Sequence, residues 1–108
     1  MTSKAKTAQI RTFANRFSAI GAEPRLRILQ SLMASPEGQR TVGEIQEDIG
    51  IPWSTLSHHL EKLRNEELVT TRKEGSFLWY RANAKVLDEM LGFLALDCQG
   101  LSKLSLTK

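Results

Sequence analysis

The 108-residue sequence predicts a mainly α-helical fold with one small β-hairpin. Helices are expected at 8–20 and 84–98, and residues 41–65 indicate a short helix, a tight turn and a longer helix. Residues 68–82 are rich in β-forming side chains around a central glycine, which indicates a hairpin. Helices followed by a helix-turn-helix and then a hairpin, the wing, are the order of a winged helix-turn-helix domain.

Length and composition predict a single domain spanning 1–108. No run of about 18 apolar residues is present, so no membrane-spanning helix is expected. The polar start lacks the apolar core of a signal peptide, and the only cysteine is Cys98, so the cytoplasm is the expected compartment. The net charge is +3, but residues 1–30 alone carry six basic residues and one acidic residue. Such a basic third of a chain suits phosphate partners, although a solvated helix face would look the same.

The first two helices are predicted from apolar spacing and from their stop and start signals. In the first, Gly21 follows an apolar stripe made of Ile10, Phe13, Phe17 and Ile20. Glu23-Pro24 then begins the second helix, because proline suits a first helical turn. This helix is expected to be central, since it is apolar on more than one side, at Leu26, Ile28, Leu29, Leu32 and Met33. Residues 35–38 form a loop by their turn chemistry.

The helix-turn-helix is predicted from its caps. Thr41 and Glu44 have the spacing of a capping box, in which each side chain bonds the other residue's amide. Gly50 is expected to end the short helix in a left-handed conformation. The longer helix then runs from residue 52 or 53 to 65, with one narrow apolar stripe at Leu56, Leu60 and Leu63.

The last helix, 84–98, is apolar around well over half of its circumference. A helix at a chain end with this pattern must be covered, and little chain remains to cover it. A second copy of the chain is therefore the expected cover, and the first and last helices are the expected dimerisation helices.

The start of the longer helix has the chemistry of a recognition helix. Small hydroxyl residues there let the backbone approach a DNA groove, and the free amides of a helix start suit a phosphate. Arg72 and Lys73 fall in the hairpin where a wing would meet the phosphate backbone. The opposing interpretation is an all-helical core in which residues 54–58 are merely exposed.

The sequence resembles the ArsR/SmtB family of bacterial metalloregulatory repressors over residues 12–96. The segments that carry the resemblance are 22–29 (AEPRLRIL), 50–60 (GIPWSTLSHHL), 63–69 and 72–81. The resemblance implies a homodimeric repressor that binds double-stranded DNA at an imperfect palindromic operator and is released by an inducer. It places five residues on the recognition-helix surface and two on the wing, namely Trp53, Ser54, Thr55, Ser57 and His58, with Arg72 and Lys73.

Several of these assignments have alternatives in the sequence. Trp53 could pack across the turn instead of touching DNA. Ser54 and Ser57 could simply cap the helix start. His59 is expected to be packed or solvated and not to read bases.

The sequence departs from the family pattern at its sensory positions. Where metal-sensing members carry cysteines before the turn, this chain has residues 41–45 (TVGEI) without thiolate or imidazole, and residues 84–98 hold no histidine. No metal site and no cofactor are therefore expected. Cys98 is a candidate thiol sensor, with a small buried hydrophobe or an exposed bystander as the alternative. Glu67 replaces the usual glycine and would cost about 1 kcal/mol in a left-handed conformation. Ser76 stands where many members have a basic wing tip.

The sequence leaves two other function classes to compare with a repressor. A winged helix can lose its DNA surface and act as a protein-interaction module without specific DNA binding. An enzyme is not expected, because the sequence has no recognisable nucleophile–base set or glycine-rich phosphate loop.

Overall fold

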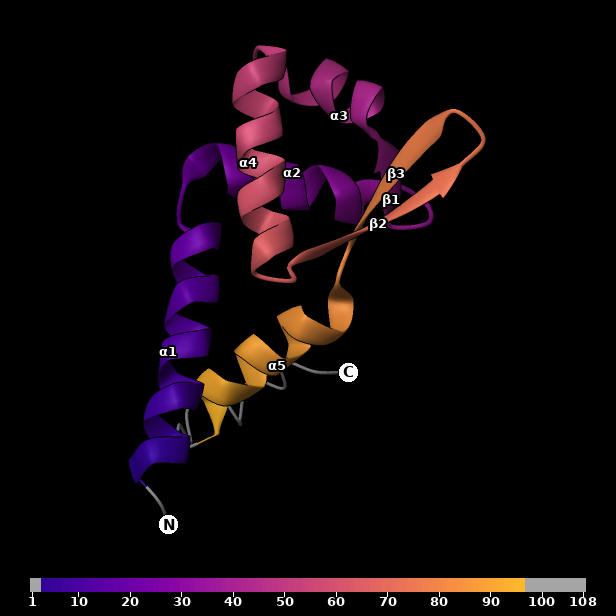
Figure 1. Cartoon of the computed structure of the whole chain (residues 1–108). Coiled ribbons are helices and arrows are strands. Elements are labelled where there is room, and N and C mark those ends of the chain that lie inside the picture. The colour runs from indigo at the N-terminus through magenta and orange to yellow at the C-terminus, as the bar shows by residue number, and fades with distance from the viewer. Residues whose placement is uncertain (1–2, 97–108) are drawn as a thin grey trace.

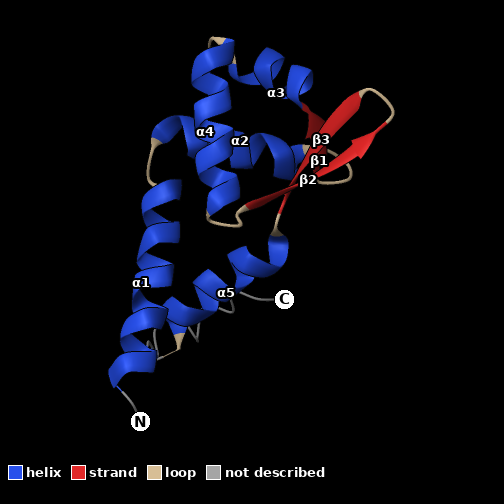
Figure 2. Ribbon diagram, viewed as in Figure 1, coloured by secondary structure: helices blue, strands red, loops and turns tan. Residues whose placement is uncertain are grey.

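The computed structural model describes the backbone of residues 3–96 and the side chains of residues 7–96. Within this part, five helices and three short strands follow one another along the chain (Figures 1 and 2). They are α1 (Ser3–Ile20), α2 (Glu23–Ala34), β1 (Gln39–Thr41), α3 (Val42–Ile49), α4 (Trp53–Asn65), β2 (Val69–Glu74), β3 (Phe77–Ala82) and α5 (Ala84–Ala95). The predicted winged helix-turn-helix is confirmed, with α3 and α4 as the helix pair and β2–β3 as the wing.

The two ends of the molecule carry different elements. Figure 1 shows α1 and α5 at one end, whereas α3, the start of α4 and the tip of the wing lie at the opposite end. α2 crosses between them and contacts α1, α3, α4 and β3. The expected dimerisation helices are thus separated from the expected DNA-contacting elements.

The core is built around α2 and the inner face of α4. Its fully buried side chains come from most elements, namely Ile28, Leu29, Leu32, Ile45, Leu56, Leu63, Leu68, Val69 and Met90. The central position predicted for α2 is confirmed, but Leu26 and Met33 are about half exposed. They lie seven residues apart, which places both on the side of α2 that faces solvent. The apolar stripe predicted for α4 is buried as expected.

The sheet has three strands, not the two predicted. β1 pairs antiparallel with β3, giving the order β1-β3-β2 and joining Arg40 to Tyr80. Three residues are too few to show an alternating pattern, which is why β1 was not predicted. β1 forms because it pairs with the free edge of β3. The hairpin lies one residue later than expected on its first strand, since Glu74 pairs with Phe77. Gly75, at φ 61°, makes the two-residue turn between them.

The caps of the helix-turn-helix are as predicted. Glu44 donates its amide to the Thr41 hydroxyl at 3.2 Å, and the Thr41 amide donates to the Glu44 carboxylate at 2.9 Å. Gly50 ends α3 at φ 77°. Glu67 has φ 62°, which is the left-handed conformation. The backbone strain expected where glutamate replaces the usual glycine is therefore present.

The two helices expected to form the dimer interface differ in extent from the prediction. α1 begins at Ser3, five residues before the predicted start at residue 8. α5 begins after Asn83, whose side chain accepts from the Val86 amide, and ends at Ala95. The predicted extension to residue 98, with Cys98, lies outside the described residues.

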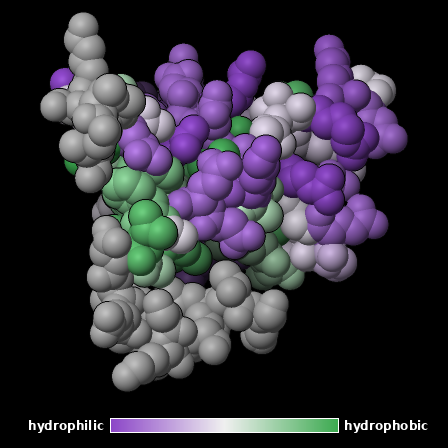
Figure 3. All heavy atoms as spheres, turned by 90° about the horizontal axis from the view of Figure 1, so that it is seen from below, coloured by the Kyte–Doolittle hydropathy of each residue, from purple (hydrophilic) through white to green (hydrophobic). Residues whose placement is uncertain are grey.

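α1 and α5 pack against each other through one aromatic pair and leave apolar side chains open. The rings of Phe13 and Phe93 stack with centroids 4.2 Å apart. On the same helices Ile10 is 51% exposed, Leu91 48% and Leu94 53%. Figure 3, which views the molecule from below, shows hydrophobic surface beside the polar surface at this end. None of the described helices combines the length and apolar character that crossing a membrane requires.

Candidate DNA-binding surface

The first turn of α4 presents free backbone donors. Pro52 is the N-cap, and no side chain bonds the amides at this helix start. The alternative that Ser54 or Ser57 caps the helix is therefore wrong. The first turn carries no acidic residue, so the amides and the positive end of the helix dipole remain open to an anion.

The side chains predicted for the recognition surface lie on the solvent side of α4. Ser54, Thr55, Ser57 and His58 are exposed, while the leucine stripe of the same helix faces the core. This division follows from the helical period, which puts the hydroxyls and the leucines on opposite sides.

Trp53 lies between the two alternatives that the sequence left open. Its side chain is 52% exposed, so it is not packed away across the turn. It lines a groove whose other walls are α3 and the wing, including Glu47 and Phe77. Half of the indole thus remains available to a partner.

His59 contacts Arg25 on α2, which selects the packed position from the two, packed or solvated, that the sequence left open. Its Nδ1 lies 3.0 Å from Nη1 of Arg25, which also donates from Nε to the Ala19 carbonyl at 2.6 Å. A guanidinium can only donate, so Nδ1 accepts and the neutral ring carries its proton on Nε2. Burial lowers the pKa of His59 below its ordinary value, with further lowering from Arg25 and then His58. His59 is therefore a packing residue that ties α4 to α2.

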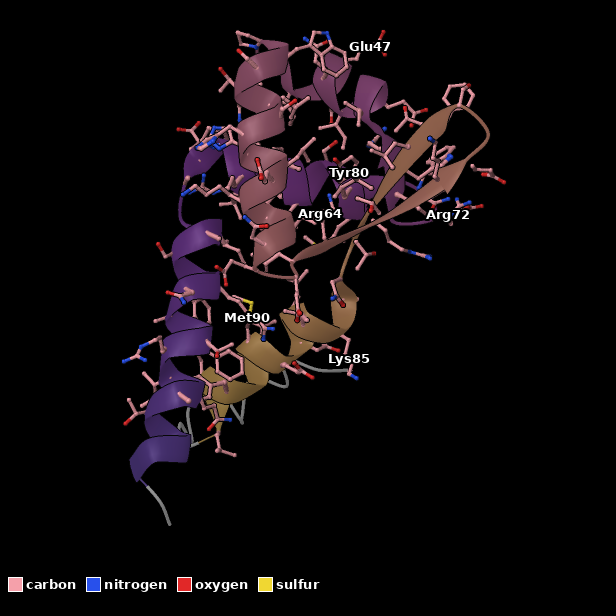
Figure 4. All side chains as sticks on the ribbon, viewed as in Figure 1. Glu47, Arg64, Arg72, Tyr80, Lys85 and Met90 are labelled. Atoms are coloured by element: carbon pink, nitrogen blue, oxygen red, sulfur yellow. The ribbon has the colours of Figure 1, made fainter. Side chains whose placement is uncertain are left out.

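The two wing residues predicted to meet phosphate are both exposed on β2, and Figure 4 labels Arg72 there. Arg72 is also held by its neighbours. Its Nη1 lies 3.0 Å from Glu74, its Nη2 donates to Gln39 at 3.4 Å, and its guanidinium lies 5.8 Å from the Trp79 ring centroid. Glu74 was not predicted as a partner of Arg72, although residues two apart in a strand point to the same face.

Side chains that could bind a metal ion are scattered over the described part of the chain. Across residues 3–96, histidine, cysteine and acidic side chains nowhere gather in the groups of three or more that could hold a metal ion. His58 and His59 are neighbours, but their ring centroids are 5.8 Å apart and their planes are tilted by 58°. His59 Nδ1 is already engaged by Arg25 and is not free to bind a metal ion.

Fold and surface together define a winged helix-turn-helix domain, and comparison with known proteins gives its family. Residues 23–71 match the model of the bacterial regulatory protein, arsR family. The transcriptional repressor SdpR of Bacillus subtilis is 32% identical over 80 residues, which are 74% of this chain and 86% of SdpR. The arsenical resistance operon repressor of Staphylococcus aureus is 39% identical over 67 residues, 62% of each chain.

Solved structures agree with the sequence relatives. NolR from Sinorhizobium fredii superposes with a TM-score of 0.70 at 32% identity, covering 88% of this chain and 92% of NolR. Mb0332 from Mycobacterium bovis, described as a homodimeric winged helix-turn-helix DNA-binding domain, superposes with a TM-score of 0.72 at 27% identity, covering 94% and 93%. The chain therefore belongs to the arsR family of bacterial regulatory proteins.

Proposed function

We propose that this chain is a homodimeric, sequence-specific DNA-binding transcriptional repressor that acts in the cytoplasm. The observation that carries the proposal is the first turn of α4, with open amides and exposed hydroxyls at Ser54, Thr55 and Ser57. Hydroxyls serve bases and phosphates alike, and the helix start suits a phosphate. Trp53, His58, Arg72 and Lys73 complete the surface. SdpR and the staphylococcal protein, both named as repressors, support the same direction of control.

The dimer follows from the surface of α1 and α5. Ile10, Leu91 and Leu94 are about half exposed on two helices that pack together. Apolar side chains grouped in this way on a soluble protein favour an interface. A second copy would give two recognition helices related by two-fold symmetry, so the operator would be an imperfect palindrome. The relative Mb0332 is described as homodimeric.

The test is selection of DNA from a random duplex library by the purified full-length protein. Sequencing of the bound pool should reveal an inverted repeat, with half-site centres about 34–36 Å apart or a multiple of it. Anisotropy titrations should then show that the protein binds this operator with higher affinity than a scrambled duplex. Affinity for both should fall steeply with salt, because phosphate contacts release counterions.

Two results would contradict the proposal. One is a selected pool without any enriched repeat, and the other is equal affinity for operator and scrambled duplex at every salt concentration. Either result would favour the alternative of a winged-helix module that binds proteins and not specific DNA.

The signal that releases the repressor is a separate proposal. A thiol signal would have to act through Cys98, because the sequence contains no other cysteine. Operator release by arsenite, zinc, persulfide and peroxide, measured in wild type and Cys98→Ser, decides the matter. Release that survives Cys98→Ser excludes the thiol mechanism for that signal.

A further inference from the structure

We infer that the groove between α3, the start of α4 and the wing binds an organic cation. The groove has a volume of about 580 Å³, and its walls include Glu44, Glu47, Trp53, Phe77 and Trp79. Three aromatic rings and two carboxylates thus face one space, although they come from three separate elements of the chain. This combination is the recognition chemistry of a positively charged organic molecule with an apolar body.

The aromatic walls are unusually open for their size. Phe77 is 60% exposed and Trp53 52%, although burial of such rings is ordinarily favourable. The face of an aromatic ring carries negative potential and attracts cations. The Arg72 guanidinium lies 5.8 Å from the Trp79 ring centroid, so this ring already meets one positive charge. Trp53 and Phe77 are the exposed rings that supply apolar contact and attraction for a further cation.

The ionisable side chains that line the groove have one sign of charge, and the nearby Arg72 guanidinium is paired with Glu74. Among the described side chains that line the groove, Glu44 and Glu47 are ionisable and none is basic. The Thr41 amide holds Glu44 Oε1 at 2.9 Å without neutralising it. Glu47 is exposed, and within residues 7–96 it forms no ion pair. Figure 4 shows Glu47 on α3, at the end of the molecule where α4 begins.

The walls also decide what kind of cation fits. A small hydrated metal ion would need several oxygen ligands, but residues 3–96 contain no group of three or more such side chains. An anion would meet two carboxylates and no basic side chain. An organic cation suits both the aromatic rings and the carboxylates of the groove, because its apolar body covers the rings while its charge faces the carboxylates.

The test uses two ions of the same shape and opposite charge, tetraphenylphosphonium and tetraphenylborate. Both tryptophans of the chain, Trp53 and Trp79, line the groove. Their fluorescence therefore reports occupancy directly in DNA-free protein. The cation should quench it saturably, with an affinity about tenfold or more above that of the anion.

Two variants locate the site. Glu47→Gln removes one charge from an exposed position and should weaken the cation severalfold, whereas the matched change Glu89→Gln on α5 should not. Gly43 also lines the groove, and a Cβ added there would meet no atom within 4 Å. Gly43→Leu should therefore fill the groove and abolish binding without disturbing the helix, which circular dichroism checks.

The inference is overturned if the anion binds as tightly as the cation. It is equally overturned if Glu47→Gln and Gly43→Leu, both folded, bind the cation like wild type. Neither outcome depends on DNA, so the result is separable from the proposed repressor function. Trp53 belongs to this groove and to the proposed DNA surface, so the two bindings are linked equilibria where both proposals hold.

Discussion

The Arg16 guanidinium on α1 lies 3.0 Å from the carboxylate of Glu67, in the turn that follows α4. Arg16 also donates from Nε to the Glu66 carbonyl at 3.2 Å, and the Asn83 side chain donates to the Glu67 carbonyl at 2.9 Å. Asn83 is the N-cap of α5. Both helices expected to form the dimer interface are thus bonded to the turn that ends the proposed recognition helix.

The first prediction concerns backbone strain at Glu67, which has φ 62°. Glu67→Ala and Glu67→Gly both remove the ion pair with Arg16, but only glycine relieves the left-handed conformation. Glu67→Gly should therefore be more stable than Glu67→Ala by about 1 kcal/mol. Urea unfolding of the two variants measures this difference.

Glu66 is the matched control, because it has an ordinary φ of −96°. There the order should reverse, with the glycine variant less stable than the alanine variant by about 0.5–1 kcal/mol. The same order at both positions would contradict the assignment of strain to Glu67.

Local signals in the sequence predicted much of the fold. The capping box of Thr41 and Glu44, the left-handed Gly50 and the leucine stripe of α4 each depend on residues within one helix or turn. β1 could not be predicted in this way, because its three residues form a strand only against β3, about 40 positions further along the chain. The exposure of Leu26 and Met33 likewise depends on which side of α2 its neighbours cover.

The candidate site was predictable in its positions but not in its contacts. The exposed hydroxyls of α4 follow from helical periodicity, and the structure places them as expected. The bond from Arg25 to His59 joins residues 34 positions apart, and only the folded chain brings them together. The groove with Trp53 and Phe77 was missed for the same reason, since its walls come from three elements.

A second prediction tests the proposed interface. Leu94→Glu places a charge on the exposed apolar surface of α5, and burial of that charge is unfavourable. Dimerisation should weaken on the order of 100-fold. Sedimentation at micromolar concentration should then give the 12.1 kDa monomer, where wild type gives twice this mass.

Leu78→Glu is the control for this change, because Leu78 is a similarly apolar, exposed residue on the wing. It should leave the sedimenting mass of the dimer unchanged. A wild-type protein that sediments as a monomer would contradict the interface outright.

The third prediction concerns pH. The pKa of His59 is lowered in the fold, by burial first and then by Arg25 and His58. Between this lowered pKa and the ordinary value near 6.5, the unfolded chain binds more protons, so stability rises with pH. The contribution of His59 is therefore complete above about pH 6.5 and is lost as the pH falls through the folded pKa.

Urea unfolding at several pH values between 5 and 7.5 measures this effect. His59→Gln should flatten the dependence, because glutamine can accept from Arg25 without titrating. A slope that persists unchanged in His59→Gln would assign it to another group.

The fourth prediction concerns base contact by α4. The double change Ser54→Ala, Ser57→Ala should weaken binding to the selected operator by about 1–3 kcal/mol. Binding to scrambled duplex should change less, and sedimentation should still give the dimer. Equal operator affinity in the variant and in wild type would remove these hydroxyls from the proposed surface.

The last prediction concerns the wing, where Glu74 is paired with Arg72 and would compete with a DNA phosphate for its guanidinium. Arg72→Ala should weaken binding to all sequences and make the salt slope shallower by about one. Glu74→Gln should act in the opposite direction, because it removes the carboxylate 3.0 Å from Nη1 and leaves the guanidinium free for a phosphate. The exposed pair is worth less than about 1 kcal/mol, so operator affinity should rise by no more than about fivefold. In the double variant Arg72→Ala, Glu74→Gln, the gain from Glu74→Gln should shrink, because only the repulsion between the Glu74 carboxylate and the DNA phosphates is then removed. Anisotropy titrations at two salt concentrations measure this gain. If Glu74→Gln raises affinity equally with and without Arg72, the ion pair does not restrain the wing.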